Sequence, residues 1–368
     1  MVTVELNDED SVKAIQDFVR NTPDINVYEY IRRGCNGDVY FGKRIKMNDN
    51  VVLKFYWSHP NYDAAEEAVI LRDIDHDNIL KIHDLRFLPP NYAYFLTPHI
   101  SGGDLQGVID SRRLSSKEAL EIIAGVLIGL TELHSKHKLV HRDLKPGNIL
   151  LDIEKNIPII ADLGAVKKIH KADGCVTASK STYLYLPPEA ILANEYYYQS
   201  DIYQIGVIMF QLLGGYFPIN SPMKWLTTRE KKQLDGTRNT TDKYWKFDEM
   251  IGKKIVKGQL VDTNTLPFYL DPGFKRVLNK ALNFHYEKRY KNPSLFLKEV
   301  HSLLRSCPNY VHESDRLLVR HENGKEFQLY KNKKDEVVLE KRLSNKEWRK
   351  DNSHNGTIES ALAVARIS

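Results

Sequence analysis

Apolar and polar positions change their spacing twice along the chain. Between Val27 and Phe55, short β-branched and aromatic runs (VYEYI, VYFGKR and VVLKFYW) are separated by Gly and Asn-Asp turns. This pattern predicts antiparallel strands. A helical segment is predicted at 63–74, and AYFLTP at 93–98 predicts a further, buried strand. The first part of the chain is therefore expected to form a β-rich lobe.

After this lobe the spacing becomes helical. Ser115 and Glu118 form an S-x-x-E capping box, and the apolar residues that follow keep to one helical face. The segment at 201–213 is apolar almost all round, which predicts a helix buried in the centre of a lobe. Two more helices are predicted at 273–283 and 293–304.

Past Pro308 the strand pattern returns. LLVRH, EFQLYK and EVVLEKR are separated by ENGK and NKKD, which predicts a small β-meander. Residues 357–366 predict a final helix. The apolar face of such strands must be covered, so we expect this part to pack on the rest of the chain.

The expected fold class is α+β and bilobal, with an antiparallel β-rich lobe, an α-rich lobe and a small C-terminal appendage. The expected boundaries are a leader at 1–23, a two-lobed domain at 24–307 and the appendage at 308–368. Within the leader, a short helix is predicted over 11–20, ended by Pro23. The chain has 368 residues, 42% of them hydrophobic, and can bury a core of this size.

Charge and cysteine content narrow the classes of function. The net charge of +5 comes from charges of both signs and is too weak to predict specific nucleic-acid binding. The three cysteines do not predict a disulfide framework, which favours a reducing, cytoplasmic location. The N-terminus lacks the basic and apolar runs of a signal peptide, and no run of about 18 uncharged apolar residues predicts a membrane span.

One loop combines a carboxylate, a cation and an amide. In VHRDLKPGNILLD (140–152), Asp143, Lys145 and Asn148 surround a Pro-Gly turn. The grouping is either accidental or serves one shared substrate. The segment resembles the catalytic loop of eukaryotic-type protein kinases, and a lysine two residues after the aspartate resembles the serine/threonine kinases.

This resemblance implies roles for the three side chains. Asp143 would accept and orient the substrate hydroxyl group, and Lys145 would neutralise the transferring phosphoryl group. Asn148 would supply an oxygen ligand to Mg²⁺. Leu150 would form the floor of the adenine pocket. The implied co-substrate is ATP.

Upstream segments occur in the order that the resemblance requires. IRRGCNGDVY (31–40) resembles the Gly-rich loop, with Gly34, Gly37 and Val39 at matching positions and Arg32 where the first glycine would stand. VVLK at 51–54 makes Lys54 the candidate for the α- and β-phosphates, held by an ion pair with Glu67. Taken alone, the segment at 31–40 could be a Gly-containing hairpin that binds no ligand. Lys54 alone could be an ordinary surface lysine.

Other segments complete the implied site. TPHISGGD (97–104) resembles the hinge between lobes, where Thr97 would guard the back of the adenine pocket. The backbone of 98–100, including His99, would hydrogen-bond adenine. IIADLGA (159–165) ends in a variant of D-F-G, so Asp162 would chelate Mg²⁺. Alone, the first segment could be a plain turn and the second a strand-ending aspartate.

Three further residues would hold the α-rich lobe together. In TYLYLPPEA (182–190), Glu189 would pair with Arg289, and Asp201 would brace the catalytic loop. The resemblance covers about residues 24–307.

Regulation through the loop from Ala165 to Leu186 has two interpretations. Arg142 precedes the catalytic aspartate, and a phosphate on the loop would pair with it in kinases of this type. Thr177 and Ser179 are the candidate phosphoacceptors, while Thr182 is expected to be structural. The alternative is a loop that is ordered without phosphorylation.

The resemblance implies an ATP- and Mg²⁺-dependent serine/threonine protein kinase that acts on protein substrates. A pseudokinase scaffold and a small-molecule kinase of related fold are the alternatives. The basic stretch at 221–246 either docks a partner or acidic substrate or is a solvated insertion, and the appendage either caps the domain or recruits substrate. An Asn- and Lys-rich chain with an unfamiliar tail suggests a microbial or viral kinase that acts on host proteins.

Overall fold

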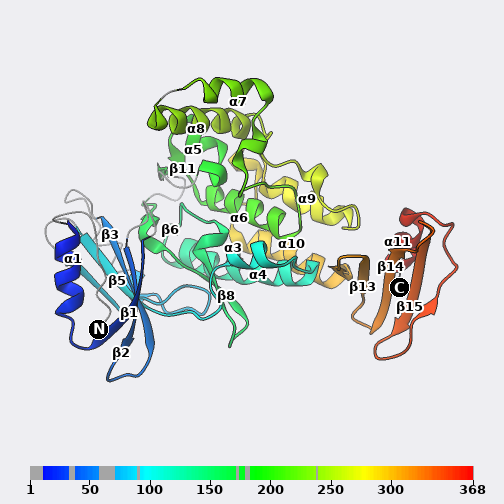
Figure 1. The fold of residues 1–368 in the computed structure, drawn as a ribbon, viewed down its shortest axis with the longest axis horizontal. Coiled ribbons are helices and arrows are strands. Elements are labelled where there is room, and N and C mark those ends of the chain that lie inside the picture. The colour runs from blue at the N-terminus through cyan, green and yellow to red at the C-terminus, as the bar shows by residue number, and fades with distance from the viewer. Residues whose placement is uncertain are drawn as a thin grey trace.

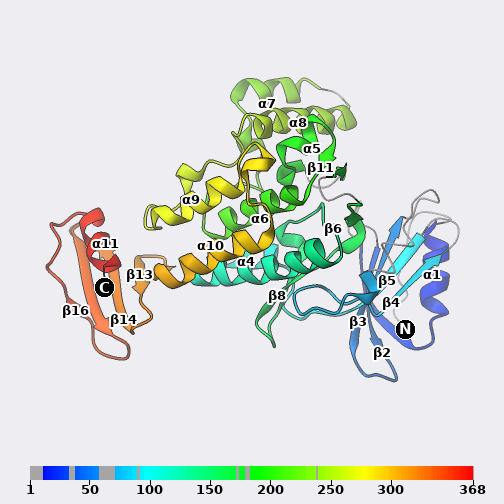
Figure 2. The same ribbon diagram turned by 180° about the vertical axis from the view of Figure 1, so that it is seen from behind.

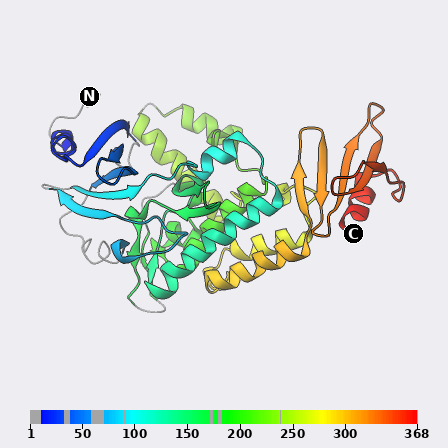
Figure 3. The same ribbon diagram turned by 90° about the horizontal axis from the view of Figure 1, so that it is seen from below.

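The computed structural model describes residues 11–32, 38–57, 71–88, 92–170, 174–178, 183–237 and 239–367. Three parts follow one another along the longest axis of the molecule: a β-rich N-lobe, a helical C-lobe and a C-terminal module (Figure 1). The view from below shows the same succession, with the module beyond the helices of the C-lobe (Figure 3). The bilobal α+β fold expected from the sequence is therefore confirmed.

The N-lobe is a five-stranded antiparallel sheet in the order β1-β2-β3-β5-β4. Helix α1 (Ser11–Arg20) covers one face, where Ile15 and Phe18 pack against Phe55 and Tyr94. The other face is turned toward the C-lobe. The strands are β1 (Ile25–Arg32), β2 (Asp38–Arg44), β3 (Asn50–Trp57), β4 (Asp84–Leu88) and β5 (Tyr92–Pro98).

The predicted strands of this lobe and the short helix over 11–20 are confirmed, whereas β4 was not predicted. Most of the helical segment predicted at 63–74 lies outside the described residues, and its last part is helical over 71–73.

The C-lobe is built around α4 (Ser116–Thr131) and α6 (Tyr198–Leu212). The predicted capping box is present, because Ser115 accepts from the N–H of Glu118 while the Glu118 carboxylate accepts from the N–H of Ser115. Helix α6 is almost wholly buried, as its apolar sequence predicts. Helices α9 (Pro272–Ala281) and α10 (Pro293–Ser306) pack against these two and confirm the remaining helix predictions.

Two glycines let α4 lie close to the strands that carry the candidate site. A Cβ atom at Gly125 would stand 2.5 Å from a ring carbon of Pro158, and one at Gly129 would stand 2.7 Å from the backbone oxygen of Asn78. Asn78 in turn donates from Nδ2 to the Pro158 carbonyl at 2.8 Å. This contact fixes β8 (Ile157–Ile160), which pairs with β7 (Ile149–Asp152), against the helix.

Shorter elements complete the C-lobe. The stretch at 221–246, expected either to dock a partner or to be a solvated insertion, contains α7 and the first part of α8, and Leu234 anchors it in the core. The shorter elements are α3 (Leu105–Ser111), α5 (Pro188–Leu192), α7 (Thr228–Asp235), α8 (Thr240–Val256), β6 (Leu139–Val140), β9 (Lys167–Lys168), β10 (Val176–Thr177) and β11 (Glu195–Tyr196).

The C-terminal module is a five-stranded antiparallel meander, as predicted, with α11 (Ile358–Arg366) on one face. Its apolar side chains belong to the same buried cluster as those of the C-lobe. The Tyr310 hydroxyl donates to Asp271 at 2.5 Å, and Arg366 donates to the Tyr269 carbonyl at 2.9 Å. The strands are β12 (Asn309–His312), β13 (Arg316–Arg320), β14 (Lys325–Lys331), β15 (Val337–Leu343) and β16 (Arg349–Lys350).

The module thus packs on the C-lobe, next to α10, as the view from behind also shows (Figure 2). The division into domains at 24–307 and 308–368 stays a prediction. Among the described residues, no helix combines the length and apolar character needed to cross a bilayer.

Candidate active site

Two rows of side chains cross the face of the N-lobe sheet that is turned toward the C-lobe. Residues paired across neighbouring strands point to the same face, so the register fixes which side chains share it. The rows are Val39, Lys54 and Phe95, and, farther out, Phe41, Val52 and Thr97. A lysine on an apolar strand is thereby directed into the space between the lobes.

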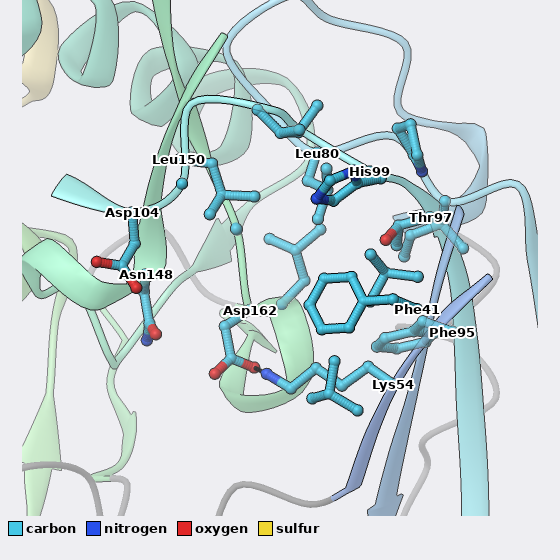
Figure 4. A pocket seen from close by; sticks show the side chains of 18 of the residues that line it. Phe41, Lys54, Leu80, Phe95, Thr97, His99, Asp104, Asn148, Leu150 and Asp162 are labelled. Atoms are coloured by element: carbon cyan, nitrogen blue, oxygen red, sulfur yellow. Dashed lines mark ion pairs between the residues drawn. The ribbon is translucent and has the colours of Figure 1, made fainter. Parts of the chain in front are cut away.

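These rows form one wall of a cavity of about 290 Å³ between the lobes. Leu150, Asn148 and Asp162 close it from the C-lobe, and Figure 4 shows the charged ends of Lys54 and Asp162 meeting as an ion pair. The remaining lining residues are Val39, Phe41, Val52, Leu80, Ile82, Phe95, Thr97, Pro98, His99, Ile100, Ser101, Gly103, Asp104, Gly147, Ala161 and Leu163. The wall is mainly apolar, with polar side chains that include Lys54, Thr97, Asp104, Asn148 and Asp162 placed around it.

The segment that connects the lobes runs along the mouth of this cavity. The N–H of His99 donates to the carbonyl of Asn50 at 3.0 Å, and the His99 ring meets Phe41 edge to face, with centroids 5.4 Å apart. We expected the backbone of 98–100 to face adenine. The N–H of His99 is used within the protein, while His99 itself lines the cavity, so the adenine contact of this segment stays a prediction.

Beyond this connection the chain is tied to the floor of the cavity. Gly103 has a φ of +67°, which favours glycine, and its carbonyl accepts from the N–H of Leu151 at 3.0 Å. Asp104 caps α3 by accepting from the N–H of Gly107 at 2.9 Å and forms an isolated bridge with Leu150. These contacts hold Leu150 below the cavity, where the sequence placed it.

The loop at 140–152 brings its carboxylate, cation and amide into direct contact. One carboxylate oxygen of Asp143, Oδ2, accepts from Lys145 Nζ and from Asn148 Nδ2, each at 2.9 Å. Asn148 Nδ2 also donates to the Asp143 carbonyl at 2.7 Å. The other oxygen, Oδ1, is buried and accepts no hydrogen bond from the residues that the structure describes. Buried acceptors without a partner are rare in proteins, so this carboxylate is a candidate functional group rather than a purely structural one.

Asp201, at the start of the buried helix α6, holds this loop from below. It accepts from the N–H of His141 at 2.8 Å and of Arg142 at 3.0 Å, and from His134 at 2.8 Å. Burial disfavours its charge, but the hydrogen bond and charge of His134 and the charge of His141 outweigh burial, so the pKa of Asp201 lies below its ordinary value. The expected brace is found.

Asp162 follows β8 and takes a left-handed backbone conformation, with a φ of +57°. Its Oδ1 lies 2.5 Å from Lys54 Nζ. Burial would raise its pKa, but the charge of Lys54 and the hydrogen bond between them prevail, so the pKa of Asp162 is lowered and the carboxylate stays ionised. An ionised carboxylate is what a metal ligand requires.

Asn148 and Asp162 both line the cavity and could hold Mg²⁺. Asn148 Nδ2 is committed to Asp143, which leaves its oxygen Oδ1 as the ligand atom. In the part of the chain that is described, no three His, Cys, Asp or Glu side chains form a metal cluster. Mg²⁺ is often held by one or two carboxylates together with phosphates and water, so the residues present fit this ion.

Glu189 and Arg289 form a buried, bidentate ion pair. The two guanidinium nitrogens donate to the two carboxylate oxygens at 2.7 and 2.8 Å. The Arg289 side chain is 0% exposed and that of Glu189 is 9% exposed. The pairing expected from the sequence is therefore present, and it joins α5 to the turn before α10.

Arg142 points toward the loop at 165–186, as expected, but its contacts are with backbone atoms. Its Nε donates to the Ala165 carbonyl at 2.7 Å and its Nη1 to the Thr177 carbonyl at 2.5 Å. Thr177 is exposed, whereas Ser179 and Thr182 lie outside the described residues.

Three predicted site residues, Gly34, Gly37 and Glu67, lie outside the described residues. Their roles therefore stay predictions. Phe41 and Asp104 line the cavity but were not predicted. Strand alternation could have found Phe41, because it follows Val39 by two positions on the same strand and shares its face.

Comparison with known proteins gives two findings. The protein kinase domain matches residues 25–306. Curated relatives include CBL-interacting serine/threonine-protein kinase 15 of Arabidopsis thaliana, 28% identical over 266 residues, or 70% of this chain and 56% of the relative. Serine/threonine-protein kinase CLA4 of Candida albicans is 27% identical over 235 residues, or 60% of this chain and 24% of the relative. The chain thus spans about half or less of the length of these relatives.

Proposed function

This chain belongs to the protein kinase family, and we propose that it transfers the γ-phosphoryl group of ATP to Ser and Thr hydroxyl groups of proteins. The observation that carries the proposal is the direct contact of Asp143 with Lys145 and Asn148 in one loop, together with Asn148 lining the cavity that Lys54 and Asp162 share.

ATP is proposed to lie with its adenine between the apolar row of the N-lobe and Leu150. Thr97, at the end of the outer row, would limit the depth of the adenine site. Lys54, directed into the cavity, would meet the α- and β-phosphates, and Val39 would cover the sugar and phosphate end.

In the reaction, the substrate hydroxyl oxygen forms a bond to the γ-phosphorus while the bond from that phosphorus to the β–γ bridging oxygen breaks, and ADP leaves. The Asp143 carboxylate orients the hydroxyl and accepts its proton. Lys145, already 2.9 Å from the other carboxylate oxygen, stabilises the charge on the transferring group. Asn148 and Asp162 would hold Mg²⁺, which neutralises phosphate charge when bound.

The lysine at position 145 and the named relatives support Ser/Thr rather than Tyr as the acceptor. Protein substrates are proposed because the chain carries the P-P-E segment and its Arg289 partner, which small-molecule kinases of related fold usually lack. The cysteines described, Cys175 and Cys307, are free thiols, which supports a reducing, intracellular location.

The test compares wild type with Asp143→Asn in a phosphotransfer assay with labelled ATP, Mg²⁺, a panel of Ser/Thr peptides and a panel of small-molecule alcohols. Removal of the base is expected to lower kcat by about 10²–10⁴-fold, because a positioned base contributes that much. Asp77→Asn, at an exposed carboxylate outside the cavity, is the matched control and should retain activity.

Each alternative function gives a different result in this assay. A wild type that binds ATP without transfer to any acceptor would indicate a pseudokinase, and transfer to alcohols alone would indicate a small-molecule kinase. Chelation of Mg²⁺ with EDTA is expected to abolish transfer, and restored Mg²⁺ to return it.

The proposal also includes autophosphorylation of the loop at 165–186. Thr177 is exposed in the 165–186 loop and offers its hydroxyl to a second molecule. Mass spectrometry after incubation with ATP is expected to find phosphate on this loop in wild type and none in Asp143→Asn.

A further inference from the structure

Arg142 uses its side chain to hold the loop at 165–186, which is called the activation segment below. The residue is 6% exposed and has a positive φ of 68°. Its guanidinium group donates to the carbonyl of Ala165, at the start of the segment, and to that of Thr177, in β10. Two donors that would otherwise attract a phosphate are therefore satisfied by the segment's own backbone.

The segment is also joined to β11. Strands β10 and β11 are antiparallel, with Val176 opposite Tyr196 and Thr177 opposite Glu195. The N–H of Ala178 extends this pairing by donating to the Asn194 carbonyl at 3.1 Å. Tyr196 is 0% exposed and lies in a buried apolar cluster that includes Val140, before the catalytic loop, and Leu186, at the end of the segment.

The hydroxyl group of Tyr196 connects β11 back to the catalytic loop. It lies 2.6 Å from Asp201 Oδ1 and 2.9 Å from Gln204 Oε1, so its proton can reach either acceptor. Asp201 Oδ1 also accepts from the N–H of Arg142, and Gln204 Oε1 also accepts from the N–H of Leu144 at 2.8 Å. Burial raises the pKa of Tyr196 well above its ordinary value, so the hydroxyl keeps its proton.

Burial of Gln204 at this position is unfavourable for the free energy of folding. It is fully buried, and its Nε2 has no hydrogen-bond partner within the part of the chain that is described. An unpaired buried amide nitrogen is unfavourable, whereas an apolar side chain would avoid it. The acceptor oxygen, which serves both Tyr196 and the catalytic loop, is what offsets this cost.

These contacts connect the catalytic loop, β10 and β11 to one another in a closed ring. Arg142 links the catalytic loop to β10, strand pairing links β10 to β11, and Tyr196 links β11 to the residues that hold the catalytic loop. In kinases regulated by phosphorylation, a phosphate paired with the arginine provides the first of these links. We propose that Tyr196 is a positioning residue which couples the activation segment to the catalytic loop, so that the enzyme is active without a phosphate on that segment.

This inference rests on the proposed function for its kinetic test, but not for its structural test. The kinetic test uses the full chain treated with a protein phosphatase, with loss of phosphate verified by mass spectrometry. Wild type and the double variant Thr177→Ala/Ser179→Ala are expected to show the same initial rate, within about twofold, and no lag. A lag, or a loss of more than tenfold after phosphatase treatment, would overturn independence from phosphate.

Tyr196→Phe removes the hydroxyl and keeps the ring. We expect kcat to fall about tenfold, the effect of one hydrogen bond to a charged group, while KM for ATP stays unchanged because the cavity is not altered. Tyr290→Phe, at another buried tyrosine in the C-lobe, is the matched control and should keep the wild-type kcat. Rates are normalised to the folded fraction measured by circular dichroism.

The structural test is hydrogen exchange read by mass spectrometry. Tyr196→Phe is expected to lose protection at 139–145 and 174–178, with the rest of the C-lobe unchanged, whereas Tyr290→Phe should not change these segments. Gln204→Leu is the second variant and should reproduce the loss at 139–145. If Tyr196→Phe exchanges hydrogen at the same rates as wild type, the coupling is refuted, whether or not the protein is active. If the wild-type protein shows no phosphotransfer, the proposed function is refuted separately.

Discussion

Replacement of Arg289 by Met tests how the C-lobe depends on its buried ion pair. The guanidinium group makes two hydrogen bonds to Glu189, at 2.7 and 2.8 Å, and others to backbone carbonyls such as that of Asn283 at 2.7 Å. Both side chains are almost inaccessible to solvent. Met fills most of the volume of the arginine stem but leaves the carboxylate without its cation.

The expected magnitude follows from what remains around Glu189. Loss of one partner of a buried pair costs about 3–5 kcal/mol, because an uncompensated charge is left behind. One partner stays, since the Ser200 hydroxyl donates to Glu189 at 2.6 Å. We therefore expect a loss near the lower end, about 3 kcal/mol in the free energy of unfolding.

The double variant Arg289→Met/Glu189→Gln separates the buried charge from lost packing. Gln removes the charge at similar volume, so the double variant should be more stable than Arg289→Met by about 1–2 kcal/mol, the scale of coupling between contacting residues. The assay is urea unfolding at pH 7, followed by circular dichroism. Variants are compared only where the free energy of unfolding depends on urea concentration with the same slope (m-value). A loss below about 1 kcal/mol in the single variant, or a double variant less stable than the single, would refute the reasoning.

Three further outcomes are expected. Gly129→Ala should lower the free energy of unfolding by about 1–3 kcal/mol in urea titrations, because its Cβ would meet the Asn78 carbonyl at 2.7 Å, and an unchanged midpoint would contradict the close packing of α4. Tyr310→Phe removes a hydroxyl that donates to the carboxylate before α9 and should cost about 1 kcal/mol and increase hydrogen exchange in the module; wild-type exchange there would argue against a docked module. Lys54 lowers the pKa of Asp162 in the folded protein, so the ionised carboxylate stabilises the fold above the unfolded-state pKa of about 3.9, and this stabilisation is lost as the pH falls through the folded-state pKa. The difference in unfolding free energy between wild type and Asp162→Asn should therefore shrink below about pH 4. A difference that stays constant with pH would contradict the ion pair.

The sequence was most informative where periodicity and side-chain chemistry agree. The capping box at Ser115 and the all-apolar run of α6 predicted their helices, because local spacing decides both. The pairing of Glu189 with Arg289 came from the resemblance and is present in the structure. This one pair, 100 residues apart in the chain, was thus predictable, whereas the contact of Lys54 with Asp162 was not predicted.

Other features leave no sequence signal. The acceptors of Arg142 are backbone carbonyls, which every residue carries, so the residues it holds could not be inferred from side-chain types. Strand β4 is short and carries a charged residue in mid-strand, and α7 is polar at all its positions except Leu234. Gln204 lies within the apolar run of α6, and only its contacts identify it as a support of the catalytic loop.

The central claim is that one nucleotide, held between the lobes, unites Lys54, Asp143, Asn148 and Asp162. The most direct measurement is a crystal structure with a non-hydrolysable ATP analogue and Mg²⁺. The predicted result places Lys54 Nζ on the α- and β-phosphates, oxygens of Asn148 and Asp162 on the ion, and the Asp143 carboxylate facing the γ-phosphoryl group. A nucleotide bound elsewhere, or one in this cavity with its phosphates directed away from Asp162, would contradict the claim.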